Sequence, residues 1–305
     1  SSGSYDTDSE CNYNIDVDLH EGANLISFYA LPDDISVANI FAGADGVIGE
    51  GVGAVYIDGT WIGSLTEVSQ DDGYWVKVSA DTTLSLTNAE PVNYDADGEV
   101  VYAIQYGNNL ISYPFETAQG LAEGLGDAAE HVYALAGEGV AALNTENGWV
   151  GSLVAFEGGN GYWLVATDDF SFSFNGTADG LSRQQIAPRL VPEVYSYSQS
   201  DEQAFFFVNN ATIRGEALES DDVIIAYNGD VIVGSRYWNG EFTDIPAIGV
   251  DSDGSEKFAD YCEAGDKVSF KVYDASTGEL VDMDVEGDVE WTKIGITVIN
   301  LTDIF

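Results

Sequence analysis

Residues 24–29 read Asn-Leu-Ile-Ser-Phe-Tyr, and residues 109–114, which begin 85 positions later, read Asn-Leu-Ile-Ser-Tyr-Pro. Further motifs recur 88 positions apart and in the same order. They are Gly-Glu-Gly-Val at 49–52 and 137–140, Trp-x-Gly-Ser-Leu at 61–65 and 149–153, and Gly-Tyr-Trp at 73–75 and 161–163. Self-similarity at a nearly fixed spacing indicates internal duplication. The chain is therefore predicted to contain two homologous modules.

The duplication places module 1 at residues 13–90 and module 2 at residues 91–178. Both contain short runs of Val, Ile, Tyr, Trp and Thr that alternate with Gly, Asp and Asn, a pattern typical of β-strands joined by turns. One short helix is expected in each module, at 37–41 and at 121–129. The predicted fold class is all-β with minor short helices.

Tight turns are marked at equivalent places in the two modules. Asp58-Gly59 follows the strand-like run 53–57, and Asn147-Gly148 occupies the same place in module 2. Both dipeptides accept the positive φ values that a type I′ turn needs. We expect a β-hairpin at each position.

The third part of the chain differs from the modules. A linker is expected at 179–193, and the remainder, 194–305, contains further strand-like runs, such as 204–208 and 267–273. Several short strands separated by turn residues predict a C-terminal β-sandwich domain. The small, polar segment 1–12 is expected to be flexible.

The charge of the chain excludes some classes of partner. Nine Lys and Arg residues stand against 53 Asp and Glu residues, which gives a net charge of −44. Nucleic acid is an unsuitable partner because its binding requires cations that neutralise phosphates. No apolar run approaches 18 residues, so membrane insertion is not expected. Lys77 is the only basic residue before Arg183, and such self-repulsion favours a salty or extracellular setting.

The chain has two cysteines, Cys11 and Cys262, far apart in the sequence. Neither lies in a Cys-x-x-Cys motif, so zinc and dithiol chemistry have no support. A disulfide between them is one interpretation and suits an oxidising compartment. Unpaired thiols, or bridges to neighbouring subunits, are the alternatives.

Two Asp-x-Asp-Gly stretches are candidate calcium sites. Calcium takes six to eight oxygen ligands, and clustered carboxylates beside a glycine bend supply several of them. A solvated turn is the simpler interpretation, and neither stretch matches a full EF-hand loop. The candidate ligands are Asp95, Asp97 and Glu99 in one stretch and Asp251, Asp253 and Glu256 in the other.

The duplicated tryptophans are interpreted as core residues of the repeat. These are Trp61, Trp75, Trp149 and Trp163. Neighbouring residues of a strand point to opposite faces, so one ring of each Gly-Tyr-Trp motif is expected to face the core. The alternative is that aromatic rings are presented to sugars.

Catalytic motifs are absent from the sequence. His20 and His131 lie in no metal-binding or nucleophile pattern. A hydrolase that uses a pair of carboxylates stays open, and Glu50 and Glu138 are the duplicated candidates. Because both stand between glycines, they more simply mark a turn common to the two modules.

The ordered motifs resemble a module found in tandem in secreted and surface proteins of marine bacteria and in virion structural proteins of marine tailed phages. The C-terminal region resembles the β domain that follows such modules. The residues that carry this second likeness are Ala204-Phe-Phe-Phe, 222–230, 233–238 and 270–274.

The resemblance implies a non-catalytic, extracellular structural or adhesive subunit of a cell surface, a filament or a virion. Self-assembly or neighbouring surface or virion proteins are the expected partners. The first alternative is a glycan-binding module that uses aromatic rings and calcium. The second is a carboxylate-dependent hydrolase.

Overall fold

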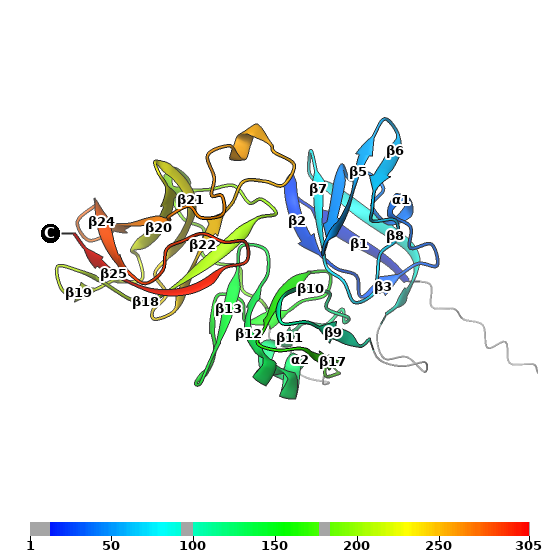
Figure 1. Ribbon diagram of the computed structural model, residues 1–305, viewed down its shortest axis with the longest axis horizontal. Coiled ribbons are helices and arrows are strands. Elements are labelled where there is room, and N and C mark those ends of the chain that lie inside the picture. The colour runs from blue at the N-terminus through cyan, green and yellow to red at the C-terminus, as the bar shows by residue number, and fades with distance from the viewer. Residues whose placement is uncertain (1–12, 93–99, 177–183, 305) are drawn as a thin grey trace, which may run out of the picture.

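The computed structural model describes residues 13–92, 100–176 and 184–304, and its fold is all-β with short helices (Figure 1). In module 1 a five-stranded sheet of order β2-β7-β4-β5-β6 packs with a three-stranded sheet of order β1-β8-β3 around one apolar core. The elements are β1 (Tyr13–Leu19), β2 (Gly22–Ile26), β3 (Ala30–Leu31), α1 (Val37–Ile40), β4 (Gly46–Gly49), β5 (Val52–Ile57), β6 (Thr60–Gly63), β7 (Tyr74–Val78) and β8 (Thr82–Pro91).

Module 2 repeats this architecture. Its main sheet has the order β10-β16-β12-β13-β14, which matches the five-stranded sheet of module 1 strand for strand. The elements are β9 (Tyr102–Ile104), β10 (Gly107–Ile111), β11 (Gln119–Gly120), α2 (Leu121–Leu125), a 3₁₀-helix (Gly126–His131), β12 (Val132–Ala136), β13 (Ala141–Thr145), β14 (Gly148–Gly151), β15 (Ala155–Phe156), β16 (Tyr162–Ala166) and β17 (Phe170–Phe172).

The hairpin register is the same in the two modules. Ala54 pairs with Gly63 in module 1, and Ala142 pairs with Gly151 in module 2. In module 1 the predicted turn has positive φ, 49° at Asp58 and 85° at the following glycine. The Asp-Gly turn therefore forms where the sequence places it.

The short helices also lie where the sequence predicts them. Helix α1 follows Ser36, which has an extended backbone but makes no side-chain capping bond. The segment expected as one helix over 121–129 contains α2 and then the 3₁₀-helix, because Gly126 has a φ of 53° and ends the α-helical turn.

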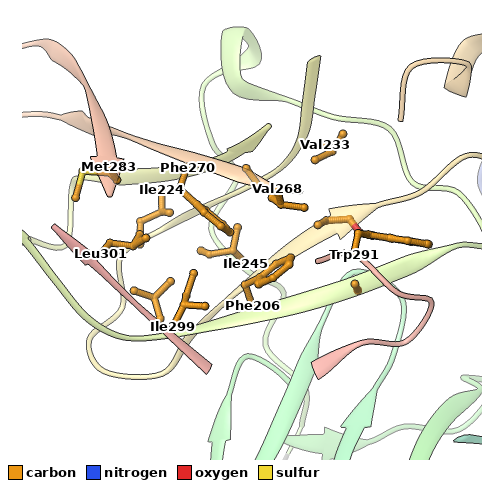
Figure 2. Packing of buried hydrophobic residues seen from close by; sticks show 14 of the residues in the cluster. Phe206, Ile224, Val233, Ile245, Val268, Phe270, Met283, Trp291, Ile299 and Leu301 are labelled. Atoms are coloured by element: carbon orange, nitrogen blue, oxygen red, sulfur yellow. The ribbon is translucent and has the colours of Figure 1, made fainter. Parts of the chain in front are cut away.

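The C-terminal domain is one curled sheet that folds over its own core in a sandwich-like manner (Figure 2). Its order is β19-β18-β25-β24-β23-β20-β21, and β22 also pairs with β18, along residues 203–208. The strands are β18 (Gln203–Ile213), β19 (Glu216–Ala217), β20 (Val223–Asn228), β21 (Val231–Tyr237), β22 (Thr243–Ile248), β23 (Ser269–Asp274), β24 (Glu279–Glu286) and β25 (Ile296–Asp303). Glu193–Tyr195 and Glu256–Phe258 form 3₁₀-helices.

Strand β18 joins this domain to the modules. Phe206 packs into the core of the C-terminal domain, where Figure 2 shows it beside Ile245. Phe205 and Phe207 point to the opposite face and pack against side chains of both modules. Because the first half of β18 is buried on both faces, its residues 204–208 are continuously apolar instead of alternating.

Candidate functional site: the interface between the modules

The two modules meet through the strands that carry the first duplicated motif. Leu25 lies in β2 and its equivalent, Leu110, lies in β10. The Glu138 carboxylate accepts a hydrogen bond from the Leu25 amide at 2.9 Å, and the Glu50 carboxylate accepts one from the Leu110 amide at 2.8 Å. Each module therefore binds the other through the same pair of residues, as subunits do in a twofold dimer.

These glutamates also occupy the turns that the sequence predicts. The turn between β4 and β5 contains Glu50 and Gly51, whose φ is 71°, and Gly139 in module 2 has a φ of 63°. Sequence reasoning missed the bond that each carboxylate makes to the other module. The sequence does contain one indication of this bond, because the glutamate and the strand that carries the leucine are duplicated together. A charge-assisted hydrogen bond requires both the carboxylate and the backbone amide that donates to it.

The glycine of each Gly-Tyr-Trp motif lies where the two backbones come closest. The Gly161 amide donates to the Leu25 carbonyl at 3.2 Å. A Cβ atom at Gly161 would lie 2.7 Å from the Ile26 carbonyl oxygen, and one at Gly73 would lie 2.8 Å from that of Ile111. Such contacts are too short for a side chain, so the interface requires glycine at both positions.

The serine of the first motif is buried in the same interface. The Ser27 hydroxyl donates to the Asn160 carbonyl at 2.6 Å, and the Ser112 hydroxyl donates to the Gln70 carbonyl at 2.8 Å. Both serines are fully buried. A hydroxyl that would be costly to bury alone thus has a partner in the other module.

The two rings of each Gly-Tyr-Trp motif pack into two different apolar clusters. Tyr74 and Tyr162 pack into the cores of their own modules. Trp75 and Trp163 are also buried, but they lie in the cluster shared between the modules and the C-terminal domain. Members of this cluster include Leu25, Leu110, Ala134, Ala136, Phe205 and Phe207.

The other duplicated tryptophans, Trp61 and Trp149, are half-buried and pack against the cores of their modules. Within the described parts of the chain, the indole N–H groups of Trp75 and Trp163 have no hydrogen-bond partner. All four rings thus contribute packing within the molecule.

The twofold relation is broken at Glu138. His20 Nε2 lies 2.6 Å from the second carboxylate oxygen of Glu138. That hydrogen bond raises the pKa of His20 to about 9, so the imidazole is positively charged at neutral pH. The equivalent residue in module 2 is Gln105, which carries no charge.

The side of the interface that contains Glu50 carries an additional acid instead. Asp72 lies there, 88 positions before Asn160 in the repeat. Burial, together with the charges of Asp71 and Glu50, raises the pKa of Asp72 to about 6. The two halves of the interface therefore respond to pH through different groups.

The C-terminal domain binds module 2 through a buried carboxylate. Asp244 accepts hydrogen bonds from the Ala141 amide at 3.2 Å, the Ser152 amide at 2.8 Å and the Ser152 hydroxyl at 2.6 Å. Arg236 donates to the Gly139 carbonyl at 2.6 Å and lies 3.5 Å from Asp244. These bonds fix the domain on the β13–β14 hairpin.

Two of the candidate calcium ligands, Asp251 and Asp253, form ion pairs with a lysine of module 1. Lys77 Nζ lies 2.7 Å from Asp251, 3.4 Å from Asp253 and 3.6 Å from Asp201. Burial and a hydrogen bond to Asp201 raise the pKa of Asp251 to about 7. Glu256 is exposed in its 3₁₀-helix. Lys77, the only Lys or Arg residue of the two modules, thus links module 1 to the C-terminal domain.

The remaining candidates divide between described and undescribed parts of the chain. Asp95, Asp97, Glu99 and Cys11 lie outside the described residues, whereas Cys262 is buried. Among the described residues, no group of three or more His, Cys, Asp and Glu side chains is placed to hold a metal ion. The calcium sites and the disulfide stay predictions.

A cleft of about 860 Å³ opens between the segment that follows module 2 and the C-terminal domain. Arg189 lies over the Tyr237 ring, 3.7 Å from its centroid, and forms an ion pair with Asp221 at 2.8 Å. Trp238 and Asn239 also line the cleft.

No protein-family model matches this sequence, and neither a curated protein nor a solved structure matches it. None of the helices in the described residues has the length and apolar character needed to span a membrane.

Proposed function

We propose that this chain is a non-catalytic structural or adhesive subunit that works outside the cell. The observation that carries the proposal is the interface between the modules. Three of the duplicated motifs supply backbone-binding carboxylates, close-approach glycines, buried serines and packing tryptophans to it. Because the duplicated residues pack the two modules against each other, we infer that the pair of modules acts as a rigid structural unit.

The carboxylates considered for hydrolysis favour this proposal. Glu50 and Glu138 each bind a backbone amide of the other module. A general acid or nucleophile needs its carboxyl group directed at a substrate. Both glutamates therefore have a structural task that explains their duplication.

The charge of the chain supports a salty, extracellular setting. A net charge of −44 makes copies of this chain repel one another in dilute buffer. Screening over about 8 Å at physiological ionic strength, and over shorter distances in brine, removes most of that repulsion. Assembly of this subunit is accordingly expected to need salt.

Sedimentation velocity of the full chain, with increasing NaCl and over a wide range of protein concentration, tests the proposal. A structural subunit that self-assembles gives larger species as salt rises. A monomer under every condition contradicts it.

Glycan binding is a second candidate function, and the cleft beside Arg189 favours it. Clefts that combine aromatic rings with a few polar groups are typical of small-ligand sites. Titrating neutral and acidic oligosaccharides against tryptophan fluorescence tests this function. A saturable change that disappears in Trp238→Ala supports it, whereas no response from any sugar contradicts it.

A further inference from the structure

The cleft beside Arg189 is built from three parts of the chain. Most of its lining residues lie in module 2 (151–154), in the connecting segment (184–189) and in the C-terminal domain (236–244). Its volume of about 860 Å³ lies within the range of about 300–1,000 Å³ that is typical of small-ligand pockets, which often form between domains. The cleft therefore has the size and the place of a binding site.

Hydrogen bonds hold the walls of the cleft in place. The Gln185 side-chain oxygen accepts a bond from the Val154 amide at 2.8 Å, and the Gln185 side-chain nitrogen donates to the Ser152 carbonyl at 2.8 Å. Arg236, which is 7% exposed, donates to the Asp244 carbonyl at 2.6 Å. Because these walls are already ordered, binding a ligand between them costs less conformational entropy than binding on a loose surface.

Backbone strain is located in one of these walls. Phe242 lines the cleft and has a φ of 62°, a value that a bulky residue rarely adopts. A hydrogen bond from its amide to the Val208 carbonyl at 2.8 Å holds it there. Strained backbone conformations cluster at ligand-binding sites. Phe242 therefore adds a second observation, besides the volume, that favours binding at this cleft.

Opposite charges nearly cancel in the lining of the cleft. Two of the chain's four arginines lie there, and each has an acidic partner. Arg189 pairs with Asp221 at 2.8 Å, and Arg236 lies 3.5 Å from Asp244. Among the described residues that line the cleft, Glu241 is the remaining charged side chain. The cleft is thus close to neutral in a chain whose net charge is −44.

This balance of charge favours a neutral ligand. An anion that approaches the cleft is repelled by the field of the whole chain. A cation, which that field attracts, finds the carboxylates of Asp221 and Asp244 already paired with arginine. The pair of Arg189 and Asp221 places hydrogen-bond donors beside acceptors, which suits a neutral molecule with adjacent hydroxyl groups.

We propose that the cleft binds a neutral sugar ring of an oligosaccharide. Trp238 lines the cleft and is half-buried against the core of the C-terminal domain, so it offers a fixed aromatic surface to the C–H groups of a pyranose. Arg189, Asp221 and the exposed Asn239 supply hydrogen bonds to its hydroxyl groups. This inference rests on glycan binding, the second candidate function, and names the class of sugar.

Recognition of a neutral sugar predicts a weak dependence on salt. Its binding neutralises no charge of the chain, so the affinity is expected to change less than about twofold from physiological to concentrated NaCl. An acidic sugar is repelled by the chain at low ionic strength and would bind more tightly as salt screens that repulsion. The salt dependence therefore separates the two classes of sugar.

Isothermal titration calorimetry of the full chain tests the proposal. The probes are neutral gluco-, manno- and galacto-oligosaccharides, with oligogalacturonates of the same length as the acidic class. Arg189→Ala is expected to weaken the binding of a neutral sugar about fivefold or more, the effect of one lost hydrogen bond. Arg214→Ala is the matched control and is expected to bind as the wild type does. Arg214 is 58% exposed, against 57% for Arg189, and it also forms one ion pair, with Glu279.

Near-UV circular dichroism shows whether Arg189→Ala is folded, and Asn239→Ala takes its place if it is not. Equal binding by the Arg189 and Arg214 variants would overturn the cleft as the site. Binding of oligogalacturonates as tight as that of the neutral sugars, or tighter, would overturn the neutral class and leave glycan binding standing. Binding of none of the sugars would overturn this inference together with glycan binding, and would leave the structural subunit proposal standing.

Discussion

At the scale of single residues, the duplicated glutamates show how far the sequence could lead. Their positions between glycines predicted a turn, and the turn is present. Their bonds to Leu25 and Leu110 could not be predicted, because they depend on how two separately folded modules meet. The ion pairs of the calcium candidates Asp251 and Asp253 could not be predicted either. Their partner, Lys77, is far from them in the sequence and close to them only in the fold.

Replacing Glu138 by alanine removes the acceptor of both the Leu25 amide and His20. A buried donor left without a partner costs about 1–3 kcal/mol, so we expect a lower midpoint of urea denaturation. Glu146→Ala is the control, because it removes the same charge from an exposed turn. Equal midpoints for the two variants would show that the carboxylate contributes nothing to the interface.

His20 makes stability depend on pH. Its pKa is about 9 in the folded chain, against an ordinary value of 6.5. The folded state therefore binds the proton more tightly, and this stabilisation is complete below about pH 6.5 and lost as the pH rises through 9.

Comparing the unfolding free energies of wild type and His20→Gln across that range tests the effect. About half of the side chain is exposed, so the difference is expected to be below about 1 kcal/mol. It should shrink steadily between pH 6.5 and 9.5. A difference that does not change with pH would exclude the histidine–glutamate bond as its source.

At the scale of elements, local signals were reliable and distant pairings were not. Asp58-Gly59 predicted its hairpin because both residues of a type I′ turn are adjacent in sequence. That β7 lies between β2 and β4 could not be predicted, because the residues of these strands are far apart along the chain. It also assigned the tryptophan of Gly-Tyr-Trp to a repeat core, whereas Trp75 and Trp163 lie in the cluster shared with the C-terminal domain.

The close approach of the modules makes a prediction for Gly161→Ala. The new methyl group would meet the Ile26 carbonyl, and the two strands would have to separate. Overpacking of this kind costs about 1–3 kcal/mol, which urea denaturation would detect. Gly176→Ala meets open space and is expected to change stability by less than about 0.5 kcal/mol. Equal stability of the two variants would mean that the contact is loose.

At the scale of the whole molecule, three units are joined by a few polar groups that each have several partners. Lys77 joins module 1 to the C-terminal domain, and Asp244 with Arg236 joins that domain to module 2. Composition predicted a strongly acidic surface but not which of its few cations would be placed between units. Those positions depend on how the three units pack against one another, an arrangement that Figure 1 shows.

Asp244→Ala is expected to be the most disruptive of these single changes. It removes the ion-pair partner of Arg236 and leaves the amides of Ala141 and Ser152 without their acceptor in a buried contact. Breaking one partner of a buried pair costs about 3–5 kcal/mol. Asp221→Ala breaks an exposed pair with Arg189 and should cost less than about 1 kcal/mol. Calorimetry of both variants checks the order, and equal melting temperatures would contradict it.

The most direct measurement is native-state hydrogen exchange at the Leu25 and Leu110 amides. If the duplicated motifs exist to join the modules, both amides exchange as slowly as the buried strands of each core, and each loses protection when the glutamate of the opposite module is replaced by alanine. Fast exchange at both leucines in the wild type, with the module cores still protected, would show that the modules fold side by side without forming this interface.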